Sequence, residues 1–280
     1  MKIAVIGLGL IGGSIAKGFK KYTDYGILGY DTDETVMKKA LESGAIDRTL
    51  GDELAECDIV VLGLYPETAI NVMKKYAPII GKNTVVTDCG GVKEKVCRGI
   101  FPIAREYGFT FIGAHPMAGI EQFGFDWSNA DMFKGASLIL TPFDETPDEK
   151  TLFLWNAFSK IGFSRLQMST PEEHDKIIAY TSQLAHVVSS SYIKSPTAMN
   201  HTGFSAGSFR DMTRVARLNE DMWTELFLEN AGNLTNEIDF VVDKMQEFSD
   251  AIKARDAETL RKLLKEGREK KELSEKCDMQ

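Results

Sequence analysis

The sequence predicts an α/β protein in which a mainly parallel sheet domain, residues 1–169, is followed by an all-helical domain. Short apolar runs recur through the first 169 residues and mostly alternate with polar segments of helical length, an order that favours a parallel sheet covered on both faces. The first run ends at a glycine cluster that opens a helix. Beyond Pro171 the strand-like runs stop, so we expect the helical domain to span residues 170–280.

The strands are expected where β-branched and aromatic residues form short runs bounded by turn-forming residues. They are Lys2–Ile6, Tyr25–Asp31, Cys57–Leu64, Asn83–Cys89, Phe109–His115, Ala136–Pro142 and Phe163–Ser169. Helices expected between them include Ser14–Lys20, Asp33–Ser43, Glu67–Tyr76 and Asp148–Ile161. In the helical domain, apolar residues at spacings of three and four suit burial against the first domain or a second copy of the chain, and a charged final helix is expected from about Asp250.

Composition excludes several classes of partner. The chain has 280 residues and is 43% hydrophobic, enough to build a core in each of two domains. Lys and Arg number 33 against 41 Asp and Glu, and the net charge of −8 argues against nucleic acid, which requires clustered basic residues. No run approaches the ~18 apolar residues of a membrane span, and Met1 leads directly into a strand and not into a signal peptide. We therefore expect a soluble, cytoplasmic protein with no membrane partner.

The cysteines are Cys57, Cys89, Cys97 and Cys277. They form no CxxC pair and show no zinc-like spacing with histidine. Free thiols in a reducing compartment, with no metal site, are therefore expected.

Residues 7–12 read GLGLIG and match the GxGxxG fingerprint of a Rossmann-like dinucleotide site. The motif directly follows a strand, opens a helix, and precedes a second strand that ends at Asp31. Gly7 allows the tight turn, Gly9 lets a pyrophosphate approach the backbone, and Gly12 permits close packing of the helix, whose N-terminus faces the negative charge. Asp31 would accept hydrogen bonds from an adenosine ribose and repel a 2′-phosphate, which favours NAD over NADP. The expected cofactor residues are Gly7, Gly9, Leu10, Ile11, Gly12, Asp31 and Asp88.

Two alternatives stand beside this interpretation. The glycine turn could belong to an α/β fold that binds no dinucleotide. Asp31 could be a surface carboxylate that caps the next helix, because "DTDET" also resembles an N-cap.

In an open parallel sheet, ligands bind beyond the carboxyl ends of the strands. The segments DCGGVK (88–93) and AHPMAG (114–119) both follow such ends and should share a cleft with the nicotinamide. A hydride leaves a carbinol carbon only when the hydroxyl proton is taken or strongly hydrogen-bonded, and an imidazole suits that task. His115 is therefore the candidate catalytic residue. The alternative is a histidine that only ties down a Pro/Gly loop.

With these motifs the sequence resembles the prephenate dehydrogenase family, enzymes of tyrosine biosynthesis that include the arogenate dehydrogenases. The resemblance is carried by GLGLIGGS, DCGGVK, GAHPMAG with Glu121 just after it, EEHDKIIAYTSQLAH, GSFRDMTRVA and MWTELFLEN. It implies that His115 hydrogen-bonds the ring hydroxyl of the substrate. It also implies that His186 and Arg214 hold the pyruvyl side chain and a carboxylate, and that the helical domain forms a homodimer.

Helical geometry agrees with several of these assignments. Asp175 and His186 are eleven residues apart and would share one face of a continuous α-helix, so that both point into one cleft. Arg210 and Arg214 are four residues apart and would present a basic face to the two carboxylates of the substrate. Glu121 would gate or order the cleft through an ion pair, unless it is simply solvated.

Two departures from the family pattern affect the substrate side. Gly91 stands where the family commonly has a serine that orients the catalytic histidine and the substrate hydroxyl. Gln183 and Ala185 stand where the family often has the histidine and proline of "SHLPH". Gly91 and Gln183 are still expected to line the substrate site, and a water, Ser14 or another side chain would replace the missing hydroxyl.

We therefore expect NAD-dependent oxidative decarboxylation of prephenate to 4-hydroxyphenylpyruvate. NAD takes a hydride from C4 of the ring, His115 takes up or hydrogen-bonds the hydroxyl proton, and the ring carboxylate leaves as CO2. The same chemistry on an aminated side chain would make the chain an arogenate dehydrogenase. Less favoured are a dehydrogenase that oxidises a 3-hydroxy acid with a lysine base, and a non-catalytic NAD(H)-binding redox sensor that dimerises through its helical domain.

Overall fold

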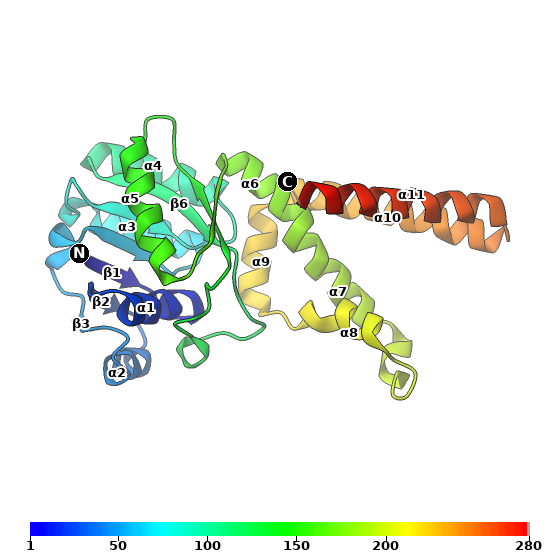
Figure 1. Cartoon of the computed structure of the whole chain (residues 1–280), viewed down its shortest axis with the longest axis horizontal. Coiled ribbons are helices and arrows are strands. Elements are labelled where there is room, and N and C mark those ends of the chain that lie inside the picture. The colour runs from blue at the N-terminus through cyan, green and yellow to red at the C-terminus, as the bar shows by residue number, and fades with distance from the viewer. Residues whose placement is uncertain (279–280) are drawn as a thin grey trace. The chain divides into compact units, whose positions relative to one another are not determined.

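The computed structural model describes residues 1–278, and the side chain of Cys277 lies outside what it describes. Within that range an eight-stranded sheet runs in the order β3-β2-β1-β4-β5-β6-β7-β8 (Figure 1). Neighbouring strands are parallel except β6 and β7, which are antiparallel. The strands are β1 (Lys2–Ile6), β2 (Gly26–Tyr30), β3 (Arg48–Thr49), β4 (Ile59–Leu62), β5 (Val85–Asp88), β6 (Thr110–Pro116), β7 (Ser137–Thr141) and β8 (Arg165–Met168). The predicted mainly parallel sheet is confirmed, and β3 is an addition that is too short to leave a periodic pattern.

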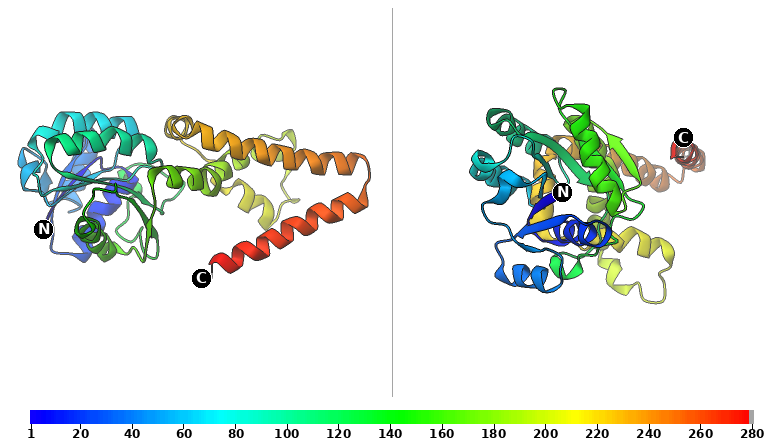
Figure 2. Two further views of the ribbon diagram at one scale, coloured as in Figure 1. Left: turned by 90° about the horizontal axis from the view of Figure 1, so that it is seen from above. Right: turned by 60° about the vertical axis from the view of Figure 1, so that its left-hand side comes forward.

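Helices cover both faces of this sheet (Figure 2). On one face lie α1 (Leu10–Tyr22), α2 (Glu34–Glu42) and α5 (Asp148–Phe158), and on the other lie α3 (Pro66–Tyr76) and α4 (Glu94–Tyr107). Side chains alternate along β1, so that Ile3 and Val5 enter the first core while Ala4 and Ile6 enter the second. Because both of its faces are buried, a central strand such as β4 is apolar throughout, whereas the edge strands β3 and β8 are exposed.

Local signals explain where several helices begin and end. The side chain of Asp33 caps α2 by accepting from the Thr35 N–H, and α4 ends at Gly108, which takes a left-handed φ of 82°. Helix α1 begins at Leu10, four residues earlier than expected. Its first turns contain Gly12, whose helix propensity is low but which the packing against the glycine loop requires.

A second group of helices comes after β8. They are α6 (Pro171–Ile178), the π-helical segment η5 (Ala179–Leu184), α7 (Ala185–Ile193), α8 (Gly207–Thr213) and α9 (Glu220–Glu229). Helix α6 begins where Thr170 accepts a hydrogen bond from the Glu173 N–H and Pro171 occupies the first turn. Short 3-10 segments are η1 (Glu53–Glu56), η2 (Ala77–Ile79), η3 (Phe125–Trp127), η4 (Ser159–Ile161), η6 (Pro196–Asn200) and η7 (Arg214–Ala216).

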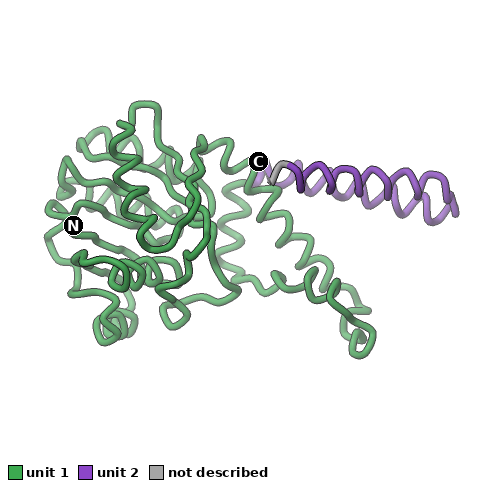
Figure 3. Tube along the Cα trace, in the orientation of Figure 1, with its two compact units in different colours: residues 1–230 green, residues 231–280 purple. Residues whose placement is uncertain are grey.

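The contacts of the chain form two compact units, residues 1–230 and residues 231–280 (Figure 3). The first contains the sheet and the helices up to Asn230. The second contains α10 (Ala231–Lys253) and α11 (Ala257–Asp278), so the final helix begins later than expected, where Asp256 accepts from the N–H groups of Glu258 and Thr259. No helix within residues 1–278 is both long enough and apolar enough to span a membrane. Cys57, Cys89 and Cys97 are free thiols, as predicted.

Candidate active site

The candidate residues gather at the carboxyl ends of neighbouring parallel strands. The glycine loop follows β1, residues 89–93 follow β5, and His115 lies near the end of β6. Because β1, β4, β5 and β6 are parallel, these three segments share one edge of the sheet. This edge is where ligands bind in open α/β sheets.

In the glycine loop an added side chain would collide with backbone atoms at Gly7 and Gly12 but would meet free space at Gly9. A Cβ atom at Gly7, whose φ is 88°, would lie 2.4 Å from the carbonyl oxygen of Gly63. A Cβ at Gly12 would lie 1.9 Å from the carbonyl oxygen of Gly7. A Cβ at Gly9 would meet no atom within 4 Å. The backbone at Gly9 is therefore accessible at the start of α1, where an anion is stabilised by the N–H groups and the helix dipole.

Leu10 and Ile11, the first residues of α1, are partly exposed beside Gly9. Asp31 lies against the same loop. One of its carboxylate oxygens accepts from the Leu8 N–H at 2.8 Å and the other from the Asp33 N–H at 3.0 Å. The cap of α2 is supplied by Asp33 and not by Asp31, which keeps acceptor capacity for a further ligand.

His115 heads a chain of hydrogen bonds that the sequence pattern did not predict. Its Nδ1 lies 2.9 Å from Nε2 of His174, and Nδ1 of His174 lies 2.7 Å from Oδ1 of Asp175. His115 is half-buried, whereas His174 is only 2% exposed. His174 stands directly before Asp175 in the segment EEHDK, which is the one sequence signal that could have drawn attention to it.

Burial lowers the pKa of both imidazoles. For His115 the pKa falls well below the usual 6.5 because of burial first, and then because of the neighbouring His174 and the positive charge of Lys93. For His174 burial also lowers the pKa, against the opposing effect of its hydrogen bond to Asp175. Both rings are therefore neutral at pH 7.

Asp88 and Asp175 occupy different positions from those expected. Asp88 is 1% exposed, forms a buried ion pair with Lys93, and accepts from the N–H groups of Gly90 and Ala114. Its oxygens hold the loop after β5 and the adjacent β6, so the expectation that Asp88 contacts the cofactor is wrong. Asp175, also 1% exposed, accepts from the N–H groups of Lys93 and Glu94 at 2.6 and 2.9 Å and thus caps α4.

Gln183 is also buried. It is 2% exposed, its Nε2 donates to the Leu226 carbonyl, and its Oε1 accepts from Asn230, so it joins α9 to the preceding helices and does not line an open cleft. Gly91 faces the same helix, since a Cβ there would lie 3.6 Å from the Leu226 side chain. The expected single face for Asp175 and His186 is also wrong, because the π-helical η5 adds a residue to the turn and rotates the subsequent helix by about 100°.

His186, Arg214 and Glu121 form a second group. Nδ1 of His186 lies 3.0 Å from the Val215 carbonyl oxygen, and its ring packs against Trp223 at 4.0 Å between centroids. Burial lowers the pKa of His186, and the nearby Arg214 lowers it further. Arg214 forms an ion pair with Glu121 in the loop after β6, as Glu121 was predicted to do.

Arg210 lies on α8, and Arg214 directly follows that helix, which ends at Thr213. Arg214 keeps a helical backbone, with φ −53° and ψ −45°, and the non-helical Val215 comes after both arginines. The paired basic face of Arg210 and Arg214 therefore stays a prediction. Ser14 does not replace the missing hydroxyl, because it donates to the Leu10 carbonyl and accepts from the Asn129 N–H.

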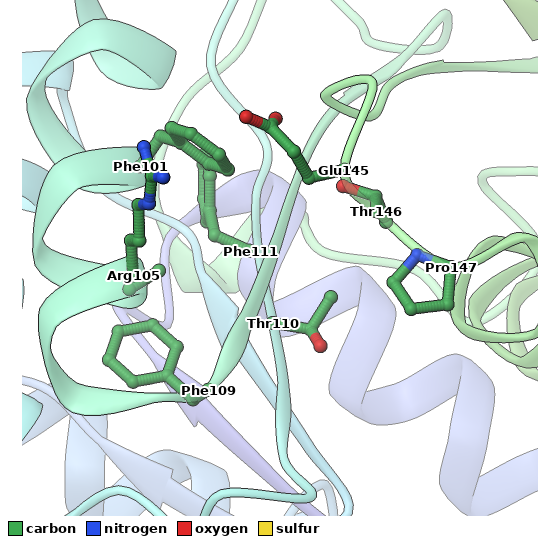
Figure 4. Close-up of a pocket in the computed structure, with 9 residues that line it drawn as sticks. Phe101, Arg105, Phe109, Thr110, Phe111, Glu145, Thr146 and Pro147 are labelled. Atoms are coloured by element: carbon green, nitrogen blue, oxygen red, sulfur yellow. The ribbon is translucent and has the colours of Figure 1, made fainter.

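A separate cavity of about 160 Å³ lies between α4, β6 and the loop before α5 (Figure 4). Its walls include Phe101 and Arg105 from α4, Phe109 just before β6, Thr110 and Phe111 at the start of β6, and residues 145–147. These β6 residues lie at the opposite end of the strand from His115. The cavity therefore contributes nothing to the candidate site.

Comparison with known proteins agrees with this geometry. A family model for the nucleotide-binding domain of prephenate dehydrogenase matches residues 15–164, and one for the dimerization domain of prephenate dehydrogenase matches residues 170–266. The first match begins after the glycine loop, so the interpretation of that loop depends on its own geometry.

Two relatives and one solved structure show how far the similarity extends. The chain is 32% identical to the cyclohexadienyl dehydrogenase of Zymomonas mobilis, over 99% of this chain and 96% of that protein. It is 28% identical to the prephenate dehydrogenase of Lactococcus lactis, over 95% of this chain and 75% of the relative. The structure of A. aeolicus prephenate dehydrogenase, in complex with hydroxyphenyl propionate and NAD+, has a TM-score of 0.85 at 28% identity and covers 97% of both chains. The chain therefore belongs to the prephenate dehydrogenase family.

Proposed function

We propose that this protein catalyses the NAD-dependent oxidative decarboxylation of prephenate to 4-hydroxyphenylpyruvate. The observation that carries the proposal is His115, a neutral, half-buried imidazole at the carboxyl end of β6. Such a group is suited to accept a hydroxyl proton near neutral pH. The A. aeolicus relative, whose structure holds NAD+ and hydroxyphenyl propionate, supports both the cofactor and an aromatic substrate.

The glycine loop fits NAD. Gly9 leaves the backbone open at the start of α1 for the pyrophosphate, and Asp31 lies against the loop with acceptor capacity for a ribose diol. A carboxylate at this position repels a 2′-phosphate, so NAD is favoured over NADP. When bound, NAD accepts the hydride from C4 of the cyclohexadienol ring.

The residues of the chain then position the substrate and move one proton. His115 accepts the C4 hydroxyl proton at Nε2, and loss of the ring carboxylate as CO2 restores aromaticity. Arg214 binds a substrate carboxylate, and His186 contacts the side chain of the substrate. Glu121, paired with Arg214, controls when that arginine is available.

A homodimer formed by the helical domain, residues 170–280, completes the proposal, with residues 1–169 as the dinucleotide-binding domain. The family model for residues 170–266 is that of a dimerization domain. Apolar side chains more than half exposed on α10 and α11 are Phe240, Val242, Met245, Ile252, Leu264 and Leu273. Exposed apolar surface of this kind typically marks an interface between chains.

One observation favours arogenate as a second candidate substrate. The Val215 carbonyl can only accept, so the hydrogen of neutral His186 lies on Nδ1 and its Nε2 is an acceptor. The side chain of arogenate carries an ammonium donor, whereas the pyruvyl group of prephenate offers only acceptors. By contrast, a lysine base is disfavoured, because Lys93, the lysine that acts on His115, is fully buried and bound to Asp88.

Initial rates of NADH or NADPH formation, with prephenate and arogenate each tried with NAD and NADP, test these proposals. We expect NADH from prephenate, and a loss of about 100-fold or more in kcat for His115→Asn with unchanged NAD affinity. His201→Asn, at an exposed histidine outside the site, is the matched control and should keep full activity. Turnover of arogenate alone would establish the second candidate. NADH binding without turnover of either compound would point to a redox sensor.

A further inference from the structure

The hydrogen-bond chain behind His115 has a defined direction. Both carboxylate oxygens of Asp175 accept hydrogen bonds at the N-terminus of α4, one from the Lys93 N–H and the other from the Glu94 N–H. A carboxylate only accepts, so the hydrogen between Asp175 and His174 lies on Nδ1 of His174. A neutral His174 then has a bare Nε2, which can only accept.

The same reasoning determines which nitrogen of His115 carries the hydrogen. Because Nε2 of His174 accepts, the hydrogen in the 2.9 Å contact lies on Nδ1 of His115. His115 therefore carries its free lone pair on Nε2, on the other side of the ring from His174. A histidine with the opposite tautomer would present an N–H to the substrate hydroxyl and could not take its proton.

We propose that His174 and Asp175 are positioning residues that hold His115 in the tautomer with a bare Nε2 and fix the direction of its ring. The inference rests on the proposed function, because only an alcohol oxidation requires His115 to accept a proton. Asp175 is bound to the start of α4 and His174 is 2% exposed, so the two residues form a rigid support that is held from a different part of the chain.

His174 and Asp175 also stabilise the positive charge that the reaction creates on His115. As the substrate O–H bond breaks, its proton forms a bond with Nε2 of His115, and the C4–H electron pair leaves as hydride to the nicotinamide. His115 then holds a hydrogen on both nitrogens and keeps its Nδ1–H donated to His174. The negative charge of Asp175, transmitted through the neutral His174, stabilises this imidazolium. The other charged groups acting on the two rings are Lys93 and Asp88, which form their own ion pair.

His174→Phe tests the proposal, because phenylalanine keeps a planar buried ring but cannot accept from His115. We expect kcat to fall about 10- to 100-fold with little change in the NAD Kd or in the substrate KM. His174→Gln, whose amide oxygen can replace the lost acceptor, should recover part of the rate. His201→Phe makes the same replacement at an exposed histidine and should leave kcat unchanged.

A second measurement does not depend on turnover. In protein with 15N-labelled histidine, the chain has four histidine rings to assign, and His115→Asn identifies the signals of His115. We expect the wild type to report hydrogen on Nδ1 of His115, and His174→Phe to shift that hydrogen toward Nε2. If His174→Phe changes neither the tautomer nor kcat, the positioning role is overturned. If the tautomer shifts in a protein that turns over neither prephenate nor arogenate, the positioning role stands and the proposed function fails.

Discussion

The buried pair of Asp88 and Lys93 leads to a prediction that separates a structural role for Asp88 from a role in cofactor binding. Their side chains are 1% and 0% exposed. Asp88→Asn leaves a buried ammonium without its counter-charge, a loss that costs about 3–5 kcal/mol. Asparagine also has one acceptor oxygen for the two N–H groups of Gly90 and Ala114 that Asp88 satisfies, which adds about 1 kcal/mol. We therefore expect Asp88→Asn to lower the free energy of unfolding by about 4 kcal/mol or more.

Lys93→Met should cost less, because Asp88 keeps both of its backbone donors. The double variant removes both charges together. Since buried pairs can often be replaced by apolar groups at little cost, it should be less destabilised than the sum of the single variants by at least about 2 kcal/mol.

Urea unfolding followed by tryptophan fluorescence measures these differences, because Trp127 and Trp155 both belong to the sheet domain. The NAD Kd of folded Asp88→Asn, measured by calorimetry, should stay within about threefold of the wild type, well below the tenfold that 1.4 kcal/mol of lost binding would produce. Additive losses below about 1 kcal/mol would refute the argument from the buried charge. If Asp88→Asn is as stable as the wild type but no longer binds NAD, Asp88 contacts the cofactor directly and its buried contacts are not its main role.

Three further predictions concern the glycine loop, the Glu121–Arg214 pair and the titration of His115. Gly12→Ala places a methyl group 1.9 Å from a backbone oxygen and should lower Tm, whereas Gly9→Ala meets no atom within 4 Å and should keep Tm but raise the NAD Kd. Thermal melts with and without NAD distinguish the two variants, and equal losses of Tm would contradict the free space at Gly9. Glu121→Gln releases Arg214, whose side chain is 64% exposed, so the free energy of unfolding should change by less than about 1 kcal/mol while the substrate KM falls up to about fivefold. Steady-state kinetics measure this KM, and a rise would mean that Glu121 instead orders the arginine. Because burial lowers the pKa of His115 well below 6.5, the base is already deprotonated at pH 7, so kcat/KM should be level from pH 7 down to 6.5 and decline only in more acidic buffer. A pH profile of kcat/KM whose acid limb is centred above 6.5 would exclude His115 as the base.

The order of strands and helices could be predicted from the sequence because hydrophobic periodicity is a local property. Each strand buried on both faces is apolar throughout, and each helix between strands repeats its apolar residues at helical spacing. The glycine loop is local in the same sense. Gly12 packs against Gly7 and Val5 of its own strand and turn, and Asp31 follows the next strand in the sequence, so the motif and the position of Asp31 could be recognised from the sequence. The contact of Gly7 with Gly63, which follows β4, is the part of the loop that depends on the tertiary fold.

Only the tertiary structure decided which polar residues meet and which are buried. His115 and His174 are 59 residues apart in the chain, and no periodic pattern relates them. Asp88, Asp175 and Gln183 were predicted to face a ligand, but the packing of α4, α6 and α9 encloses them and supplies their partners. The single added residue in the π-helical η5 leaves no mark on composition, yet it turns His186 away from the face expected for it. Hydrophobic burial depends on each residue and its near neighbours, whereas hydrogen bonds between distant segments depend on how the whole chain packs. For that reason the sequence determined the scaffold, and the folded chain determined the hydrogen bonds of the site.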